Sequence, residues 1–208
     1  MKHARDHEKA VSSYIMKDMN AEIEKVYAEI RRILDRKGTC TVSVDGRCGS
    51  GKSTFAQKLK EDFDAEVFHM DDFFLRPEQR TPQRYASPGE NVDHERFEEE
   101  ILIPLSQGKA FVYYPFDCER MCVSETGIKA QKKPVTVIEG SYSQRSDLRK
   151  YYDLNVFLTV DPDEQIRRII ARNPSKEQAF REKWIPLEEA YFKAFDVEDN
   201  ADIIVRNQ

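Results

Sequence analysis

The segment that most constrains the fold is Gly46–Ser53, whose sequence Gly-Arg-Cys-Gly-Ser-Gly-Lys-Ser fits the pattern G-x-x-x-x-G-K-[ST]. Residues 41–44 before it, Thr-Val-Ser-Val, predict a strand, and residues 54–60 after it predict a helix. A glycine loop between a strand and a helix lets backbone N–H groups turn inward around phosphate oxygens, where a Cβ atom would obstruct them. The sequence therefore predicts a phosphate-binding loop and a nucleoside triphosphate as ligand.

Two side chains of this loop are expected to act on the phosphates and their metal. We expect Lys52 to reach the β- and γ-phosphates and the Ser53 hydroxyl to ligate Mg²⁺. The start of the following helix adds unpaired N–H groups and the positive end of the helix dipole. An ordinary glycine turn is the alternative, and Cys48 is expected to be a small filler in either case. The predicted nucleotide contacts are Gly46, Cys48, Gly49, Ser50, Gly51, Lys52, Ser53 and Thr54.

Strands and helices alternate along the rest of the chain. Short apolar strands are predicted at residues 66–70, 134–138, 154–160 and 201–205, and helices at 93–105 and 163–172. This alternation indicates an α/β fold with a mostly parallel sheet between two helical layers, a three-layer sandwich of the P-loop NTPase type, over residues 39–208.

Three segments between these elements are predicted to lie outside the central sheet. Residues 75–90 carry several prolines without visible periodicity, so we expect a surface loop, with a substrate flap as one role. Pro115 denies the aromatic segment 110–116 a central position in a sheet. Residues 117–133 are polar and predict a short hairpin or loop.

A long helix is predicted before the first strand, over about residues 4–36. Apolar residues recur in it at spacings of three and four, and Lys37-Gly38 ends it. Residues 1–38 therefore form a helical extension, whose apolar face packs either on the sheet or on a neighbouring subunit, so a homo-oligomer stays open. The apolar positions are Val11, Ile15, Met19, Ile23, Val26, Ile30 and Ile33.

Composition limits the partners and the location. The net charge of −5 does not favour nonspecific binding of nucleic acid, and no uninterrupted apolar run is long enough to span a membrane. Residues 1–7 are not followed by the apolar core of a secretory signal, and four cysteines are too few for a disulfide scaffold. We therefore expect a cytoplasmic protein with reduced cysteines and a small-molecule partner.

Acidic residues follow two of the predicted strands. Asp71 and Asp72 end the strand at 66–70, and Glu139 ends the strand at 134–138. Open α/β sheets place ligands at the carboxyl ends of their strands. We expect Asp71 to orient or deprotonate an acceptor hydroxyl and to touch the metal shell, and Glu139 to hold Mg²⁺ or its water. The alternatives are an Asp-Asp cap or turn and a strand-end acid without a ligand.

Arginines gather on the helix at 163–172. Arg168 and Arg172 are four residues apart and share a helix face, and Arg167 lies next to them. They are candidates to close over the phosphates and neutralise charge in the transition state. A solvated helix face is the alternative.

From Thr41 to Val205 the chain resembles the uridine kinase-like branch of the phosphoribulokinase/uridine kinase family of P-loop kinases. The resemblance is carried, in this order, by the glycine loop, Met-Asp-Asp-Phe-Phe, Val-Asp-His-Glu-Arg-Phe, Val-Ile-Glu-Gly, Ile-Arg-Arg-Ile-Ile-Ala-Arg and Ala-Asp-Ile-Ile-Val. It implies ATP- and Mg²⁺-dependent phosphorylation of a small-molecule hydroxyl. It also implies roles for Asp71 as base, Glu139 as metal-side acid, Asp93 on sugar hydroxyls, Tyr113 against the nucleobase, and Arg168 and Arg172 in the lid.

The chain also departs from this family pattern. Cys118 stands where uridine kinases carry a base-reading His, the arginines are spaced one residue wider than Arg-Arg-x-x-Arg, and the Arg-Gly-Arg lid segment is missing, with Arg181 or Lys183 as substitutes. The sequence thus predicts a kinase for a nucleoside-like acceptor. The alternatives are a pantothenate-like or sugar acceptor, and a nucleotide-binding switch module with slow ATPase activity.

Overall fold

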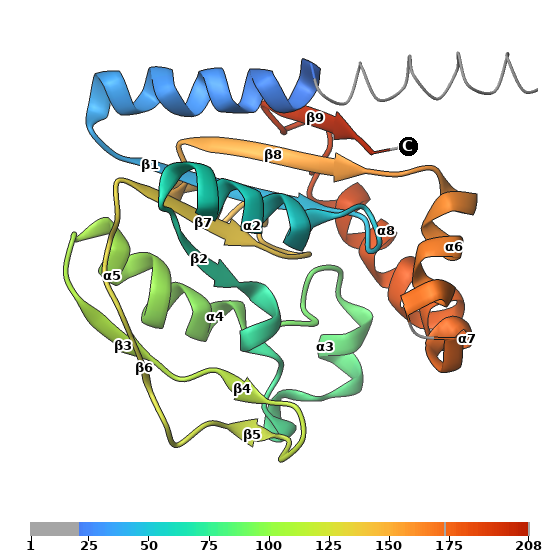
Figure 1. Cartoon of the computed structure of the whole chain (residues 1–208). Coiled ribbons are helices and arrows are strands. Elements are labelled where there is room, and N and C mark those ends of the chain that lie inside the picture. Colours follow the sequence, from blue (N-terminus) through green and yellow to red (C-terminus); the bar gives the residue numbers. More distant parts are fainter. Residues whose placement is uncertain (1–20, 173, 208) are drawn as a thin grey trace, which may run out of the picture.

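A parallel sheet of five strands forms the centre of the computed structural model, which describes residues 21–172 and 174–207. The strand order is β2-β7-β1-β8-β9, and all four pairings are parallel (Figure 1). The predicted α/β fold with a mostly parallel sheet is confirmed. The strands are β1 (Cys40–Gly46), β2 (Glu66–His69), β7 (Val135–Glu139), β8 (Leu154–Thr159) and β9 (Ile203–Arg206).

Helices cover both faces of this sheet. The longer ones are residues 21–37, α2 (Lys52–Phe63), α6 (Pro162–Arg172) and α8 (Ile185–Ala194). The predicted helix at 93–105 consists of α4 (His94–Phe97), a π-helical turn (Glu98–Leu102) and α5 (Ile103–Ser106). The short helices are α3 (Pro82–Ala86), α7 (Glu177–Ala179), a second π-helical turn (Phe180–Trp184) and the 3₁₀ turns Met70–Phe73, Pro77–Gln79, Arg149–Tyr151 and Pro174–Lys176.

The two faces of the sheet carry separate hydrophobic clusters. Successive residues of a strand point to opposite faces, so Val137 joins one cluster and Ile138 the other, as do Val156 and Phe157. The helix at 21–37 and α2 complete the first cluster, and α4, the following π-helical turn, α5 and α8 complete the second. Every residue of β1 and β7 is buried, as expected for parallel strands covered on both sides.

The N-terminal helix belongs to the same core as the sheet. Val26, Ile30 and Ile33 are fully or nearly fully buried in the cluster that contains β1 and β7, and Ile23 packs against it. The described part of the apolar stripe therefore packs on the sheet of its own chain, whereas Val11, Ile15 and Met19 lie outside the described residues. The division at residue 38 stays a prediction.

The segments predicted to lie beside the sheet do so, with one correction. β3 (Phe111–Tyr113) pairs with β6 (Ile128–Ala130), and β4 (Phe116–Asp117) pairs with β5 (Cys122–Val123), each as a separate two-stranded sheet. The expectation of a loop throughout 75–90 is wrong at α3, which Thr81 caps by accepting a hydrogen bond from the Arg84 N–H. A five-residue helix is too short to show a 3.6-residue period, but Thr followed by Pro is a start signal.

No helix within residues 21–172 and 174–207 combines the length and the apolar character that a membrane crossing requires.

The packing of the N-terminal helix yields a stability prediction. Ile30→Ala removes a side chain with no exposed surface and leaves a cavity against the sheet, so we expect a loss of about 2–5 kcal/mol in the free energy of unfolding. Urea denaturation measures this loss. Lys25→Ala, an exposed position on the same helix, is the control and should change stability by less than about 0.5 kcal/mol. Equal effects of the two substitutions would contradict the packing described here.

Candidate nucleotide and acceptor site

The glycine loop joins β1 to α2, as predicted. Gly46 has φ 137°, and a Cβ there would lie 1.9 Å from the carbonyl oxygen of Leu158. Gly51 has φ 96°, and a Cβ there would lie 2.7 Å from the amide nitrogen of Asn207. The loop therefore requires glycine at both positions, once for close strand packing and once at the helix start.

The strand register brings the loop and the acidic residues to one edge of the sheet. Glu139 lies opposite Val44 of β1 and opposite His69 of β2. The carboxyl ends of β2, β7 and β1 therefore align, with Asp71 two residues past the end of β2. This arrangement is the one that the ligand-binding edge of an open α/β sheet requires.

The two residues predicted to hold the metal from the loop and from β7 touch each other. The Ser53 hydroxyl donates to Glu139 Oε1 at 3.1 Å, and Glu139 Oε2 lies 2.7 Å from His69 Nδ1. This hydrogen bond raises the pKa of His69. Sequence analysis missed His69, although its position directly before Met-Asp-Asp at the end of a strand was a usable signal.

Asp71 lines the cavity, where its side chain keeps exposed surface although protein atoms surround it. This desolvation, with the negative charge of Glu139 as second cause, raises the pKa of Asp71. Two carboxylates and a nearby serine hydroxyl form a set of hard oxygen donors that suits Mg²⁺. Ser53, Glu139 and Asp71 therefore fit the predicted metal.

Lys52 lies over the loop. Its ammonium donates to the carbonyl oxygens of Gly46 at 2.7 Å and Arg47 at 3.2 Å, and only 9% of the residue is exposed. The ammonium group is thus held at the loop. A bound phosphate group would replace these carbonyl oxygens as its hydrogen-bond partner.

A cavity of about 760 Å³ unites most of the predicted site residues. It is lined by Cys48, Gly49, Gly51, Lys52, Ser53, Thr54, Asp71, Glu139, Arg168 and Arg172. Gly46 and Ser50 are buried in the loop and are not among the described residues that line the cavity. The size suits a small-molecule ligand.

The arginines of α6 divide between the cavity and solvent. Arg168 donates to the carbonyl oxygen of Gly49 at 3.3 Å, which ties the helix to the loop, and Arg172 lines the cavity farther along. Arg167 pairs with Glu164, and its side chain is 77% exposed. Of the proposed substitutes for the missing lid segment, Arg181 pairs with Glu177 and Lys183 lies over Trp184; neither is among the described residues that line the cavity.

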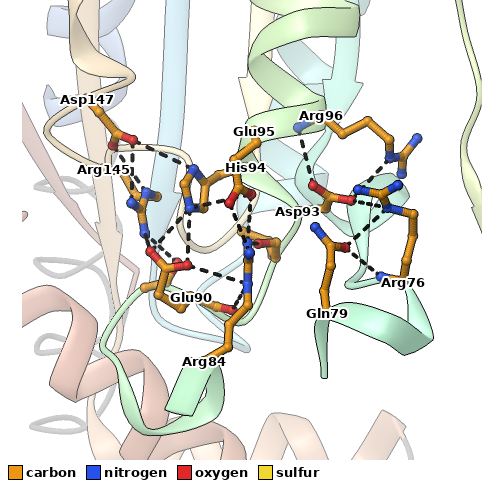
Figure 2. A network of polar contacts seen from close by, with 12 residues as sticks. Arg76, Gln79, Arg84, Glu90, Asp93, His94, Glu95, Arg96, Arg145 and Asp147 are labelled. Atoms are coloured by element: carbon orange, nitrogen blue, oxygen red, sulfur yellow. Dashed lines mark hydrogen bonds and ion pairs between the residues drawn. The ribbon is translucent and has the colours of Figure 1, made fainter. Parts of the chain in front are cut away.

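The structure does not bring Asp93 and Tyr113 to the cavity. Asp93 is fully buried; it caps α4 by accepting from the Arg96 N–H and pairs with Arg76 Nε at 2.9 Å (Figure 2). Tyr113 is 7% exposed and packs edge-on against Phe68. Their roles toward an acceptor stay predictions without a contact to support them.

The loop cysteine is enclosed by groups that sequence analysis missed. The Cys48 N–H donates to Glu188 at 3.0 Å, and Gln165 donates to the Cys48 carbonyl at 2.9 Å. Burial raises the pKa of the Cys48 thiol, so it stays protonated, as a filler would. Glu188 also accepts from Ser141 at 2.6 Å. These partners come from α6 and α8, more than a hundred residues away, and no local pattern announces them.

A network of charged side chains lies next to α4 (Figure 2). Glu90, His94 and Glu95 place their ligand atoms within 4.8 Å of one another, a geometry that could hold a metal. However, Arg84 pairs with both carboxylates and Arg145 pairs with Glu90 at 3.0 Å. The arginines already balance these charges, so the cluster is an ion-pair network.

A comparison with curated proteins finds a kinase among the relatives of this chain. The uridine kinase of Clostridium novyi (strain NT) is 25% identical over 145 residues, which cover 64% of this chain and 67% of that protein. This similarity is consistent with the resemblance to the uridine kinase-like P-loop kinases.

The fold is shared with solved kinases. A possible uridine kinase from Bacillus stearothermophilus superimposes with a TM-score of 0.61 at 20% identity, covering 86% of this chain and 98% of that one. A D-glycerate 3-kinase from Cryptococcus neoformans var. grubii gives a TM-score of 0.55 at 14% identity, covering 88% and 95%. At these identities the solved structures establish the fold alone. No family model matches the chain.

Asp45, near the end of β1, anchors the start of the phosphate loop. Its fully buried carboxylate accepts from the N–H groups of Gly46 at 2.7 Å and Gln144 at 2.9 Å and from the Tyr191 hydroxyl at 2.8 Å. Burial outweighs these bonds and raises the pKa of Asp45 from 3.8 to about 6. The folded protein therefore binds this proton more tightly than the unfolded chain does, and the contribution of Asp45 to stability falls as pH rises from about 4 to 6.

Asp45→Asn is expected to destabilise the protein, because one of its amide hydrogens must face an N–H or hydroxyl donor. The loss should be larger at pH 4.5 than at pH 7.5, by about 2 kcal/mol, since only the aspartate gains stability from the proton at low pH. Urea unfolding of both proteins at both pH values measures the difference. A loss that is equal at the two pH values, or larger at pH 7.5, would show that burial does not dominate this carboxylate.

Proposed function

We propose that this protein transfers the γ-phosphoryl group of ATP to a hydroxyl of a small, nucleoside-like acceptor. The supporting observation is that Lys52, Ser53, Asp71 and Glu139, from three separate segments, line one cavity. A phosphate cradle, metal ligands and a carboxylate for the acceptor are the parts that phosphoryl transfer needs.

On the donor side, the glycine loop binds the phosphates through its backbone N–H groups, and Lys52 binds the β- and γ-phosphates. Ser53 and Glu139, already in contact at 3.1 Å, would hold Mg²⁺, which when bound neutralises charge on the β- and γ-phosphates. Arg168 and Arg172 approach from α6 and stabilise the charge of the transferring group. Closing the cavity over the phosphates excludes water, which competes as an acceptor.

On the acceptor side, Asp71 accepts the proton of the attacking hydroxyl. The enclosure that raises its pKa also makes it a stronger base than an ordinary surface aspartate. The cavity continues past Asp71 to Phe74, Asn91 and Val92, which gives room for the rest of the acceptor. A nucleoside-like acceptor agrees with the uridine kinase relative, while Cys118 in place of a base-reading His leaves the base itself open.

The first test of this function replaces the proposed base. Asp71→Asn should lower acceptor-stimulated ADP release by about 10²- to 10⁴-fold, because the acceptor hydroxyl loses its proton acceptor, while ATP binding stays near normal. The assay follows ADP release from ATP·Mg²⁺ with uridine, cytidine, D-ribose, D-glycerate and pantothenate as acceptors. Asp72→Asn, one residue along, is the comparator. Acceptor-independent hydrolysis that is insensitive to Asp71→Asn would favour the nucleotide-switch alternative.

The second test removes the loop cation. Lys52→Ala should weaken ATP binding by roughly tenfold or more and lower turnover as well, because the charge-assisted contact to the phosphates is lost. Titration with a fluorescent ATP analogue measures the first effect and ADP release the second. Lys60→Ala, exposed on the same helix, is the matched control. Full activity of Lys52→Ala would refute the assignment of the phosphate loop.

A further inference from the structure

The cavity spans the sheet from one edge strand to the other. Asp71 follows β2, Val205 belongs to β9 and Asn207 follows β9, and all three residues line the cavity. β2 and β9 are the opposite edges of the five-stranded sheet, and the phosphate loop follows β1 at its centre (Figure 1). The cavity therefore extends from the loop in two directions, toward β2 and toward β9.

The proposed reaction decides which part of the nucleotide lies in each direction. The inference drawn here rests on that function, in which Asp71 accepts the proton of a hydroxyl that attacks the γ-phosphate in line. The γ-phosphate is therefore the part of ATP that lies nearest to β2. The ribose and the base follow on the other side of the loop, toward β9.

Three elements form the wall of the cavity at the β9 end. Val205 and Asn207 come from the last strand and the residue after it. Thr54 and Lys58 come from α2, where their spacing of four residues places them on one helix face. The third element is the N-terminal helix at residues 21–37, which contributes Ile23.

Asn207 connects this end of the cavity to the phosphate loop. Its Nδ2 donates to the carbonyl oxygen of Ser50 at 2.7 Å, and its Oδ1 accepts from Arg168 at 3.5 Å. The β9 end is thus continuous with the loop that is expected to bind the phosphates.

Polar contacts hold the first turns of the N-terminal helix at this end. Glu22 accepts from the backbone N–H of Arg206 at 2.6 Å and pairs with the guanidinium of Arg206 at 3.3 Å. The Tyr27 hydroxyl donates to Asp62 of α2 at 2.5 Å. The helix is therefore attached to β9 and to α2, and Ile23 lies between these two attachments along the helix.

The side chain of Ile23 is shared between the hydrophobic core and the cavity. It packs against the cluster on this face of the sheet, but it is only partly buried and it lines the cavity. Val26, Ile30 and Ile33 of the same apolar stripe are buried and are not among the described residues that line the cavity. Apolar surface left facing a ligand cavity is stabilised when apolar ligand surface covers it, and the base supplies the flat apolar surface of ATP.

We propose that Ile23 forms one wall of the subsite for the base of the nucleotide. The N-terminal helix is then part of the nucleotide site and not a separate extension. Ile23 positions the base through van der Waals contact and does not read its hydrogen-bonding groups. Because it contacts no group that changes during phosphoryl transfer, it contributes to nucleotide affinity and not to the chemical step.

The test measures the affinity for ATP·Mg²⁺ by isothermal titration calorimetry, using variants of the full chain. Ile23→Ala removes most of the apolar surface that the base would cover, so we expect the Kd for ATP to rise roughly five- to tenfold. In the ADP-release assay, kcat and the KM for the stimulating acceptor should stay within about twofold, because the acceptor binds at the opposite end of the cavity.

Leu34→Ala is the matched control. Leu34 lies on the same helix and is partly buried against the same cluster, but it is not among the described residues that line the cavity. Both substitutions should lower the thermal midpoint of the ligand-free protein to a similar extent, since each removes partly buried apolar surface. Only Ile23→Ala should also weaken ATP binding.

The outcomes separate this inference from the function on which it rests. If the wild-type protein does not bind ATP, the proposed function is overturned and the inference with it. If it binds ATP, and Ile23→Ala leaves the Kd unchanged or both variants raise it equally, the inference alone is overturned. A rise in the acceptor KM without a rise in the Kd for ATP also overturns it. Should Ile23→Ala fail to fold, Ile23→Val decides, with an expected rise in Kd of roughly two- to threefold.

Discussion

The buried carboxylate of Asp45 is the interaction on which the rest of the site depends. It joins the first residue of the phosphate loop, the segment after β7 and α8 through three hydrogen bonds. A fully buried charge is costly unless such bonds surround it, so the three segments must keep their relative positions for the charge to remain there. The phosphate loop and the segment that carries Tyr142 are thereby attached to the same carboxylate.

The sheet register supplies the second constraint. Because β7 lies between β1 and β2, the acid at its end touches the loop serine on one side and His69 on the other. Residues from positions 53, 69 and 139 become one continuous polar chain, with Asp71 adjoining it at the cavity. A slip of one residue in either pairing would turn Glu139 to the other face of the sheet and break this chain.

The site concentrates unfavourable features that the core compensates. The negative charge of Glu139 acts on Asp71, the side-chain amide of Asn91 has no hydrogen-bond partner among the described residues, and Tyr142 holds a left-handed backbone. Two hydrophobic clusters on the faces of the sheet, closed by the N-terminal helix on one side and by α8 on the other, keep this geometry in place. Features that cost stability at one edge of the sheet are the expected signs of a surface arranged for ligands.

The sequence by itself determined what depends on near neighbours along the chain. The glycine loop, the apolar strands and the acids at their ends follow local patterns, so the parallel sheet, Lys52, Ser53, Asp71 and Glu139 could all be predicted. Tertiary structure alone decided which polar groups reach the cavity. Arg76 and the start of α4 engage Asp93, and the aromatic core takes up Tyr113. Each outcome depends on a partner from another segment, and a contact between distant segments exists only once the sheet has brought them together.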